Sequence, residues 1–128
     1  MKKLSFIFLL IVSLFVLAGC SVSGINFGYA GTNRDGNMSY TYLSFNSSEK
    51  HTVELSAGDT LSLDVSAEVL EGNLVFKVLN PDNEVIWSLA AEDDISQTAE
   101  LSVEESGFYN LVVEGNQTKG NFKFKWEN

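Results

Sequence analysis

Cysteine, proline and histidine each occur once in the 128-residue chain, as Cys20, Pro81 and His51. A lone cysteine excludes an internal disulfide and a zinc site with several thiolate ligands. A lone histidine excludes a metal site that uses two or more imidazole ligands. The folded part of the chain must therefore be held together by a packed core of apolar side chains.

Positive charge is also scarce, with 8 Lys and Arg residues against 17 Asp and Glu and a formal net charge of −9. Nucleic acids and anionic lipid headgroups are bound through Lys and Arg side chains, which neutralise the phosphates. An acidic surface repels both. The composition therefore excludes nucleic acid as a partner.

The first residues have the three-part layout of a secretory signal. Lys2 and Lys3 form a basic start, and an apolar run from Leu4 to Ala18 is interrupted only by two serines. A helix over this run would cover roughly 22 Å, which is shorter than the hydrocarbon layer of about 30 Å. We therefore expect residues 1–19 to be an export signal that is cleaved.

The end of this signal, Leu17-Ala18-Gly19-Cys20, resembles the lipobox of bacterial lipoproteins. In that family a diacylglyceryl group is joined to the cysteine thiol, and the lipoprotein signal peptidase then cleaves before the cysteine. The resemblance implies cleavage between Gly19 and Cys20 and a membrane anchor of palmitate-type acyl chains on Cys20. The alternative is a soluble secreted protein whose lone cysteine follows Ala-Gly by chance.

The resemblance also implies a location, the bacterial cell membrane with the anchored domain facing outward. In a cell with two membranes, Ser21 stands where lipoproteins retained in the inner membrane have an aspartate. Lipoprotein rules then imply delivery to the outer membrane, with the domain in the periplasm.

Three regions are expected along the chain: the signal (1–19), the lipidated cysteine with a flexible tether (20–38), and a folded domain (39–128). The tether is rich in Gly, Asn and Ser and lacks sustained periodicity. Its mean reach would be roughly 20 to 25 Å. Ile25, Phe27 and Tyr29 do alternate, so part of this segment can instead pair as an edge strand.

From residue 39 onward, apolar residues recur at every second position and turn residues separate the runs. No helical period is long enough to cover a sheet. Antiparallel strands without helices must bury their apolar faces against a second sheet. We expect an all-β, antiparallel β-sandwich, jelly-roll-like, with about eight strands near 40–45, 51–56, 61–69, 74–78, 85–89, 99–103, 107–115 and 120–126.

From about Thr60 to Trp126 the domain carries four runs in succession, GDTLSLDV, LVFKVLNPDNEVIW, ESGFYNLVVEG and GNFKFKW. The succession resembles small extracellular β-sandwich modules such as the pre-peptidase C-terminal and GOLD-type domains. These modules also pair a strand that ends at an Asn-Pro turn with a later Gly-x-Tyr-x-Leu-x-Val strand. The resemblance implies a binding or accessory module, and no enzymatic activity.

The residues themselves also argue against catalysis. His51 begins a strand, and no Gly-x-Ser-x-Gly elbow accompanies it, so we expect an exposed strand residue and not a member of a catalytic triad. We expect no cofactor. Calcium is the one metal considered, since loop carboxylates suit it, but a solvated acidic loop is the favoured interpretation for its candidates, Asp82, Glu92, Asp93 and Asp94.

Aromatic and aliphatic side chains provide a second kind of candidate site. Phe108 and Val112 lie on the face of their strand opposite the apolar run of Tyr109 and its neighbours. Exposed on the surface, they would form a binding patch together with Tyr40 and Tyr42. Coverage of both faces of this strand is the alternative.

The function expected from these features is an envelope lipoprotein that displays a non-catalytic β-sandwich to a protein or glycan partner. One alternative is an immunity or inhibitor lipoprotein that binds a cationic toxin or lytic enzyme through its acidic surface. Another is a structural or accessory subunit of an envelope complex.

Overall fold

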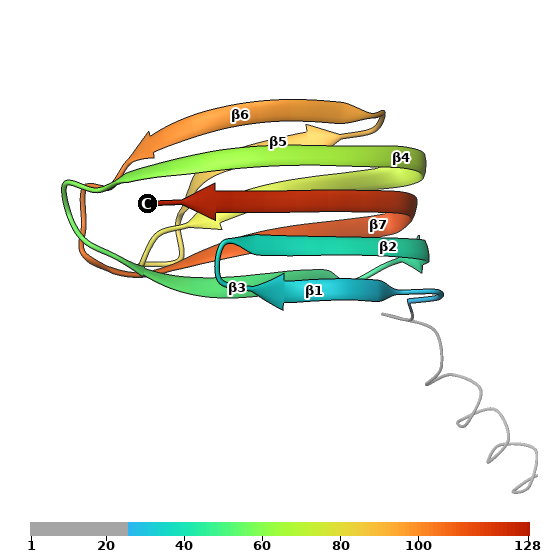
Figure 1. The fold of residues 1–128 in the computed structure, drawn as a ribbon, viewed down its shortest axis with the longest axis horizontal. Coiled ribbons are helices and arrows are strands. Elements are labelled where there is room, and N and C mark those ends of the chain that lie inside the picture. Colours follow the sequence, from blue (N-terminus) through green and yellow to red (C-terminus); the bar gives the residue numbers. More distant parts are fainter. Residues whose placement is uncertain (1–25) are drawn as a thin grey trace, which may run out of the picture.

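The computed structural model describes residues 26–128, and the predicted signal and Cys20 lie outside them. The described part is all-β and antiparallel, as expected (Figure 1). No helix in it is long and apolar enough to span a bilayer. Its seven strands are β1 (Ala30–Arg34), β2 (Asn37–Phe45), β3 (Ser48–Leu55), β4 (Thr60–Leu79), β5 (Val85–Ala91), β6 (Ile95–Ser102) and β7 (Gly107–Glu127).

Two long strands, β4 and β7, organise the fold. They pair along nearly their whole length, from Ser62 opposite Glu127 to Leu79 opposite Asn110. Both fold over midway, as the green-to-yellow and orange-to-red ribbons of Figure 1 show. The register shifts of this ladder fall between Val69 and Asn73, at the fold. One two-stranded ribbon therefore supplies the centre of both layers of the molecule.

The halves of these strands define two sheets. Sheet I contains β2, the second half of β7, the first half of β4 and β6, with β1 added outside β2. Sheet II contains β3, the first half of β7, the second half of β4 and β5. Apart from β1, the order is that of a jelly-roll sandwich. The predicted fold class is therefore confirmed, and four of the eight predicted runs are the halves of two continuous strands.

The bend at which β4 and β7 fold over depends on two glycines. Gly72 (φ 68°) and Gly120 (φ 139°) both have backbone angles that L side chains rarely adopt. A Cβ on Gly72 would overlap the carbonyl oxygen of Asn116, and one on Gly120 would overlap that of Glu68. Past the fold, the inward-facing positions change from odd to even numbers along both strands. The sequence shows this change as two separate runs.

The core lies between the sheets and is largely aromatic. Phe122 of β7 is buried, with its ring 5.7 Å from Tyr40, 6.0 Å from Phe45 and 6.0 Å from Phe76, measured between centroids. Phe76 belongs to sheet II, so this contact joins the two layers. A continuous aromatic cluster thus provides the packed core that a chain with one cysteine requires.

The segment expected to be a tether, residues 20–38, contains in its second half β1 and the start of β2, which belong to sheet I, so the alternative of an edge strand applies there. The five residues of β1 are all exposed, so the strand has no apolar alternation by which it could be found. Tyr29, just before it, stacks on Tyr40 with ring centroids 4.5 Å apart. The folded domain therefore begins well before residue 39.

Candidate functional site

The outer face of sheet II carries the predicted binding residues Phe108 and Val112. Outward-facing side chains here alternate with core residues along β3, β7 and β4. Pairing with β3 sets them in three rows, Glu54 with Phe108, Thr52 with Asn110, and Lys50 with Val112. Phe108 occupies the end of this face where β7 begins.

Phe108 is exposed, with 61% of its surface accessible to solvent. In the next row, the hydroxyl of Thr52 donates a hydrogen bond of 2.6 Å to the side-chain oxygen of Asn110. This bond orients the Asn110 amide on the same face of β7 as Phe108, two residues further along the strand. An exposed ring beside oriented polar groups can stack on an apolar ligand face while the polar groups bind hydroxyls.

Three of the four predicted surface residues do not form an exposed patch. Val112 is only 9% exposed, and it pairs with Lys50 on one side and Lys77 on the other. Tyr42 is a core residue at 2% exposure, and Tyr40 is half-buried against the core. The expected patch is therefore wrong for Tyr42 and Val112, and Phe108 alone is a prominent exposed ring on this face.

Three tyrosines, Tyr29, Tyr40 and Tyr42, pack together at the core side of sheet I. Burial raises the pKa of Tyr42 to about 12. The pKa values of Tyr29 and Tyr40 are also raised, by burial first and then by the nearby carboxylate of Glu49. All three hydroxyls stay protonated at neutral pH and add no charge to this side of the sandwich.

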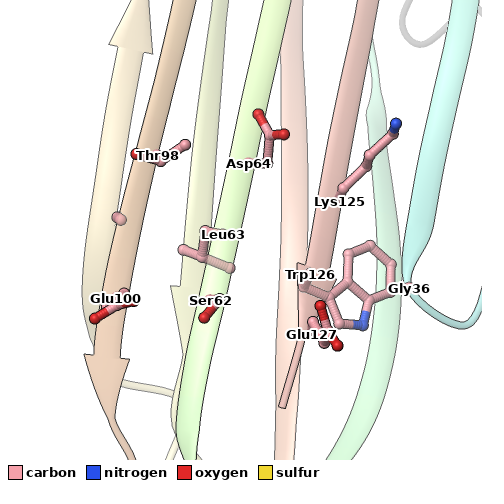
Figure 2. Close-up of a pocket in the computed structure, with 10 residues that line it drawn as sticks. Gly36, Ser62, Leu63, Asp64, Thr98, Glu100, Lys125, Trp126 and Glu127 are labelled. Atoms are coloured by element: carbon pink, nitrogen blue, oxygen red, sulfur yellow. The ribbon is translucent and has the colours of Figure 1, made fainter.

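A broad depression of about 800 Å³ lies over the other layer, sheet I (Figure 2). Polar side chains of three adjacent strands line it, with Asp64 directly opposite Lys125 in the ladder. Its one aromatic residue, Trp126, is only 7% exposed. The lining thus offers hydrogen-bonding groups without an accessible ring. Its outward-facing residues are Ser62, Asp64, Thr98, Glu100, Lys125 and Glu127.

His51 is half-buried, although the sequence predicts an exposed residue. Its Nδ1 lies 2.8 Å from Oδ1 of Asn33 and its Nε2 lies 2.9 Å from Oδ1 of Asp35. Its ring packs against Trp126 with centroids 4.9 Å apart. Both nitrogens are therefore engaged by the β1 region, and the side chain fastens the edge of sheet I to β3 of sheet II.

The calcium candidates are divided between two turns. Asp82 precedes β5, whereas residues 92–94 follow it, so the seven residues of this strand separate them. Among residues 26–128, no group of three or more His, Cys, Asp or Glu side chains is placed to hold a metal ion. Oδ1 of Asp94 instead accepts a 3.0 Å hydrogen bond from the backbone N–H of Val69, at the register shift of β4.

This contact predicts that Asp94→Ala lowers the free energy of unfolding by about 1 to 2 kcal/mol, because it leaves the Val69 N–H without its acceptor. Urea denaturation with a chelator present measures the loss. Asp93→Ala, the matched control, should change stability by less than about 0.5 kcal/mol. A loss that appeared only when calcium was added would show that Asp94 is a metal ligand.

No protein family model matches the chain, and no curated protein matches it. Several solved structures are similar in shape. One, described as "CBM4 structure and function", is 13% identical, with a TM-score of 0.54 over 84% of this chain and 77% of that one. The module TmCBM61, solved with β-1,4-galactotriose, is 17% identical, with a TM-score of 0.47 and coverages of 82% and 70%.

A third similar structure is the carbohydrate binding module of lichenase 5A from Cellvibrio mixtus, solved in complex with cellotriose. It is 14% identical to this chain, with a TM-score of 0.41 and coverages of 80% and 86%. At such low identities a structural similarity shows a shared fold and not a shared ligand. The first comparison shows that this chain has the β-sandwich fold of a carbohydrate-binding module.

Proposed function

We propose that the protein is a bacterial lipoprotein, anchored through Cys20, whose non-catalytic β-sandwich binds a neutral glycan on the outer face of sheet II. The observation that carries the glycan site is the exposed ring of Phe108 beside the hydrogen-bonded pair Thr52 and Asn110. The anchor rests on the lipobox-like residues that end at Cys20.

The geometry of the domain suits this anchor. Five residues lie between Cys20 and Asn26, where the described structure begins, and Phe27 already pairs with Ser44 of β2. Ala30 lies beside the fold of β4 and β7, since it pairs with Thr41 and Thr41 pairs with Asn121. Phe108 is at the opposite end of the sandwich, where β7 begins (Figure 1). The proposed site thus faces away from the membrane.

The chemistry of the face favours a neutral sugar. One side of a pyranose ring presents C–H groups that pack on an aromatic ring, and its hydroxyls bond to amides and hydroxyls such as Asn110 and Thr52. The net charge of −9 disfavours anionic polymers. A carbohydrate-binding module has the same fold, so a glycan site is compatible with this architecture. A non-catalytic role agrees with the structural use of both nitrogens of His51.

Phe108→Ala should weaken glycan binding by roughly tenfold or more, because the mutation removes the stacking surface. Isothermal titration with cellotriose, β-1,4-galactotriose and soluble neutral polysaccharides measures the change. Phe27→Ala is the matched control, since Phe27 is 62% exposed but lies in another segment, before β1. Equal losses in the two variants, or no binding of any neutral glycan by the wild type, would contradict the proposal.

A further inference from the structure

One edge of sheet II, the strand β5, is unusual in its composition. Four strands form the outer edges of the two layers in residues 26–128: β1, β3, β5 and β6. Three of them carry charged residues, as natural edge strands usually do, because charge discourages pairing with another chain. β5 reads VIWSLAA and carries no charge. It is therefore the edge best suited to accept another strand.

The free side of β5 is accessible along the strand. β5 pairs with β4 in regular register from Ala91 opposite Leu74 to Trp87 opposite Val78, and a register shift at Ile86 precedes Val85 opposite Leu79. Among residues 26–128, no strand pairs with its other side. Val85 is 52% exposed and Ile86 is 43% exposed. The regular part of the strand, from Trp87 to Ala91, offers backbone donors and acceptors to an incoming chain.

A hollow adjoins this edge. It measures about 400 Å³ and lies between β5 and β6, with Ile86, Leu101 and Tyr109 in its lining. Glu100, Glu104 and Glu105 also line it. An added strand would find space there for an apolar side chain, and the carboxylates would attract a neighbouring Lys or Arg.

The charges at the two ends of β5 decide which occupant fits. Asp82 and Glu84 precede the strand, Glu92 and Asp93 follow it, and all four are exposed. A second copy of β5 in antiparallel pairing would place these acidic ends against each other, which disfavours self-association. A strand with Lys or Arg at both ends would instead meet opposite charge at each end.

The geometry points to β5 as the docking edge for an extended peptide segment of a partner protein, apolar at alternate positions and basic at both ends. The segment would add as a further strand to sheet II, with backbone hydrogen bonds providing affinity and the acidic ends providing selection. This site is separate from the glycan face, because it uses the edge of the sheet and not the surface around Phe108.

Fluorescence anisotropy with the labelled peptide KKTVTVTKK and the full-length lipoprotein in detergent micelles tests the inference. The peptide should bind, and binding should weaken as salt is raised. EETVTVTEE should not bind, because its ends repel the acidic turns. KKTPTPTKK keeps the charges but lacks the N–H groups of the two valine positions and resists extended pairing, and equal binding of this peptide would overturn the strand-addition model.

A charge-reversal variant locates the site. The double variant Asp82→Lys/Asp93→Lys should bind KKTVTVTKK with roughly tenfold lower affinity. The control variant Asp64→Lys/Glu68→Lys, on the outer face of sheet I, should keep most of the affinity. Hydrogen exchange of the β5 amides should slow when the peptide is added. Protection elsewhere, or equal losses in both variants, would overturn the assignment. Phe108→Ala should leave peptide binding intact, which separates this test from that of the glycan site.

Discussion

Phe122→Ala is expected to lower the free energy of unfolding by about 3 to 5 kcal/mol, because it removes a large side chain from the centre of the core. Phe122 is 1% exposed and touches rings from both sheets, including Phe45 and Phe76. Removal of its side chain leaves a cavity at the contact between the layers, and neighbouring rings held by two sheets cannot close it fully.

Urea denaturation followed by circular dichroism measures this loss. Phe108→Ala is the control, because it removes the same ring from the surface and should change stability by less than about 0.5 kcal/mol. Similar losses for the two variants would contradict the central position of Phe122 in the core.

Cys20→Ala is expected to move most of the protein from the membrane fraction to the soluble fraction. Each buried methylene of an acyl chain contributes about 0.8 kcal/mol, so two chains hold a protein firmly, and the variant has no thiol to carry them. Cell fractionation, with metabolic labelling by palmitate, measures both the location and the modification. Ser21→Ala, one residue further on, should remain labelled and in the membrane. A Cys20→Ala protein that still sedimented with membranes would contradict the anchor.

Much of the fold can be predicted from alternation alone. The runs around Leu63, Phe76, Leu111 and Phe124 mark one buried face per strand, and the eight runs correspond to the eight strands of a jelly roll. Alternation cannot show that 61–69 and 74–78 belong to one strand, because Gly72 reads equally well as a hairpin turn and as a fold in a continuous strand. Nor can it reveal β1, whose residues are all exposed.

The candidate site was only partly predictable. Phe108 stands out because it is an aromatic residue on the outward side of a strand with a strong inward pattern. Tyr42 and Tyr40 follow the same alternation as Met38, and only the packing against Phe122 shows that they point inward. Val112 is buried between residues of two other strands, β3 and β4, which no local pattern brings together.

The remaining surfaces depend on strand order and not on local sequence. The depression over sheet I joins polar residues of β4, β6 and β7 that read separately as ordinary solvent-facing positions. Likewise, β5 reads as a regular strand, and its place at an edge follows only from its pairing with β4 alone. The pairing of strands therefore decides which regular strands line the depression and which lie at an edge.

An NMR titration tests the proposed glycan site most directly. The isotope-labelled protein is titrated with a neutral oligosaccharide that binds in the calorimetric experiment. Amide and side-chain shifts should change at Phe108, Asn110 and Thr52 on the outer face of sheet II, in a saturable manner. Shifts confined to the depression over sheet I, around Asp64 and Thr98, or no shifts with any neutral glycan, would contradict this account.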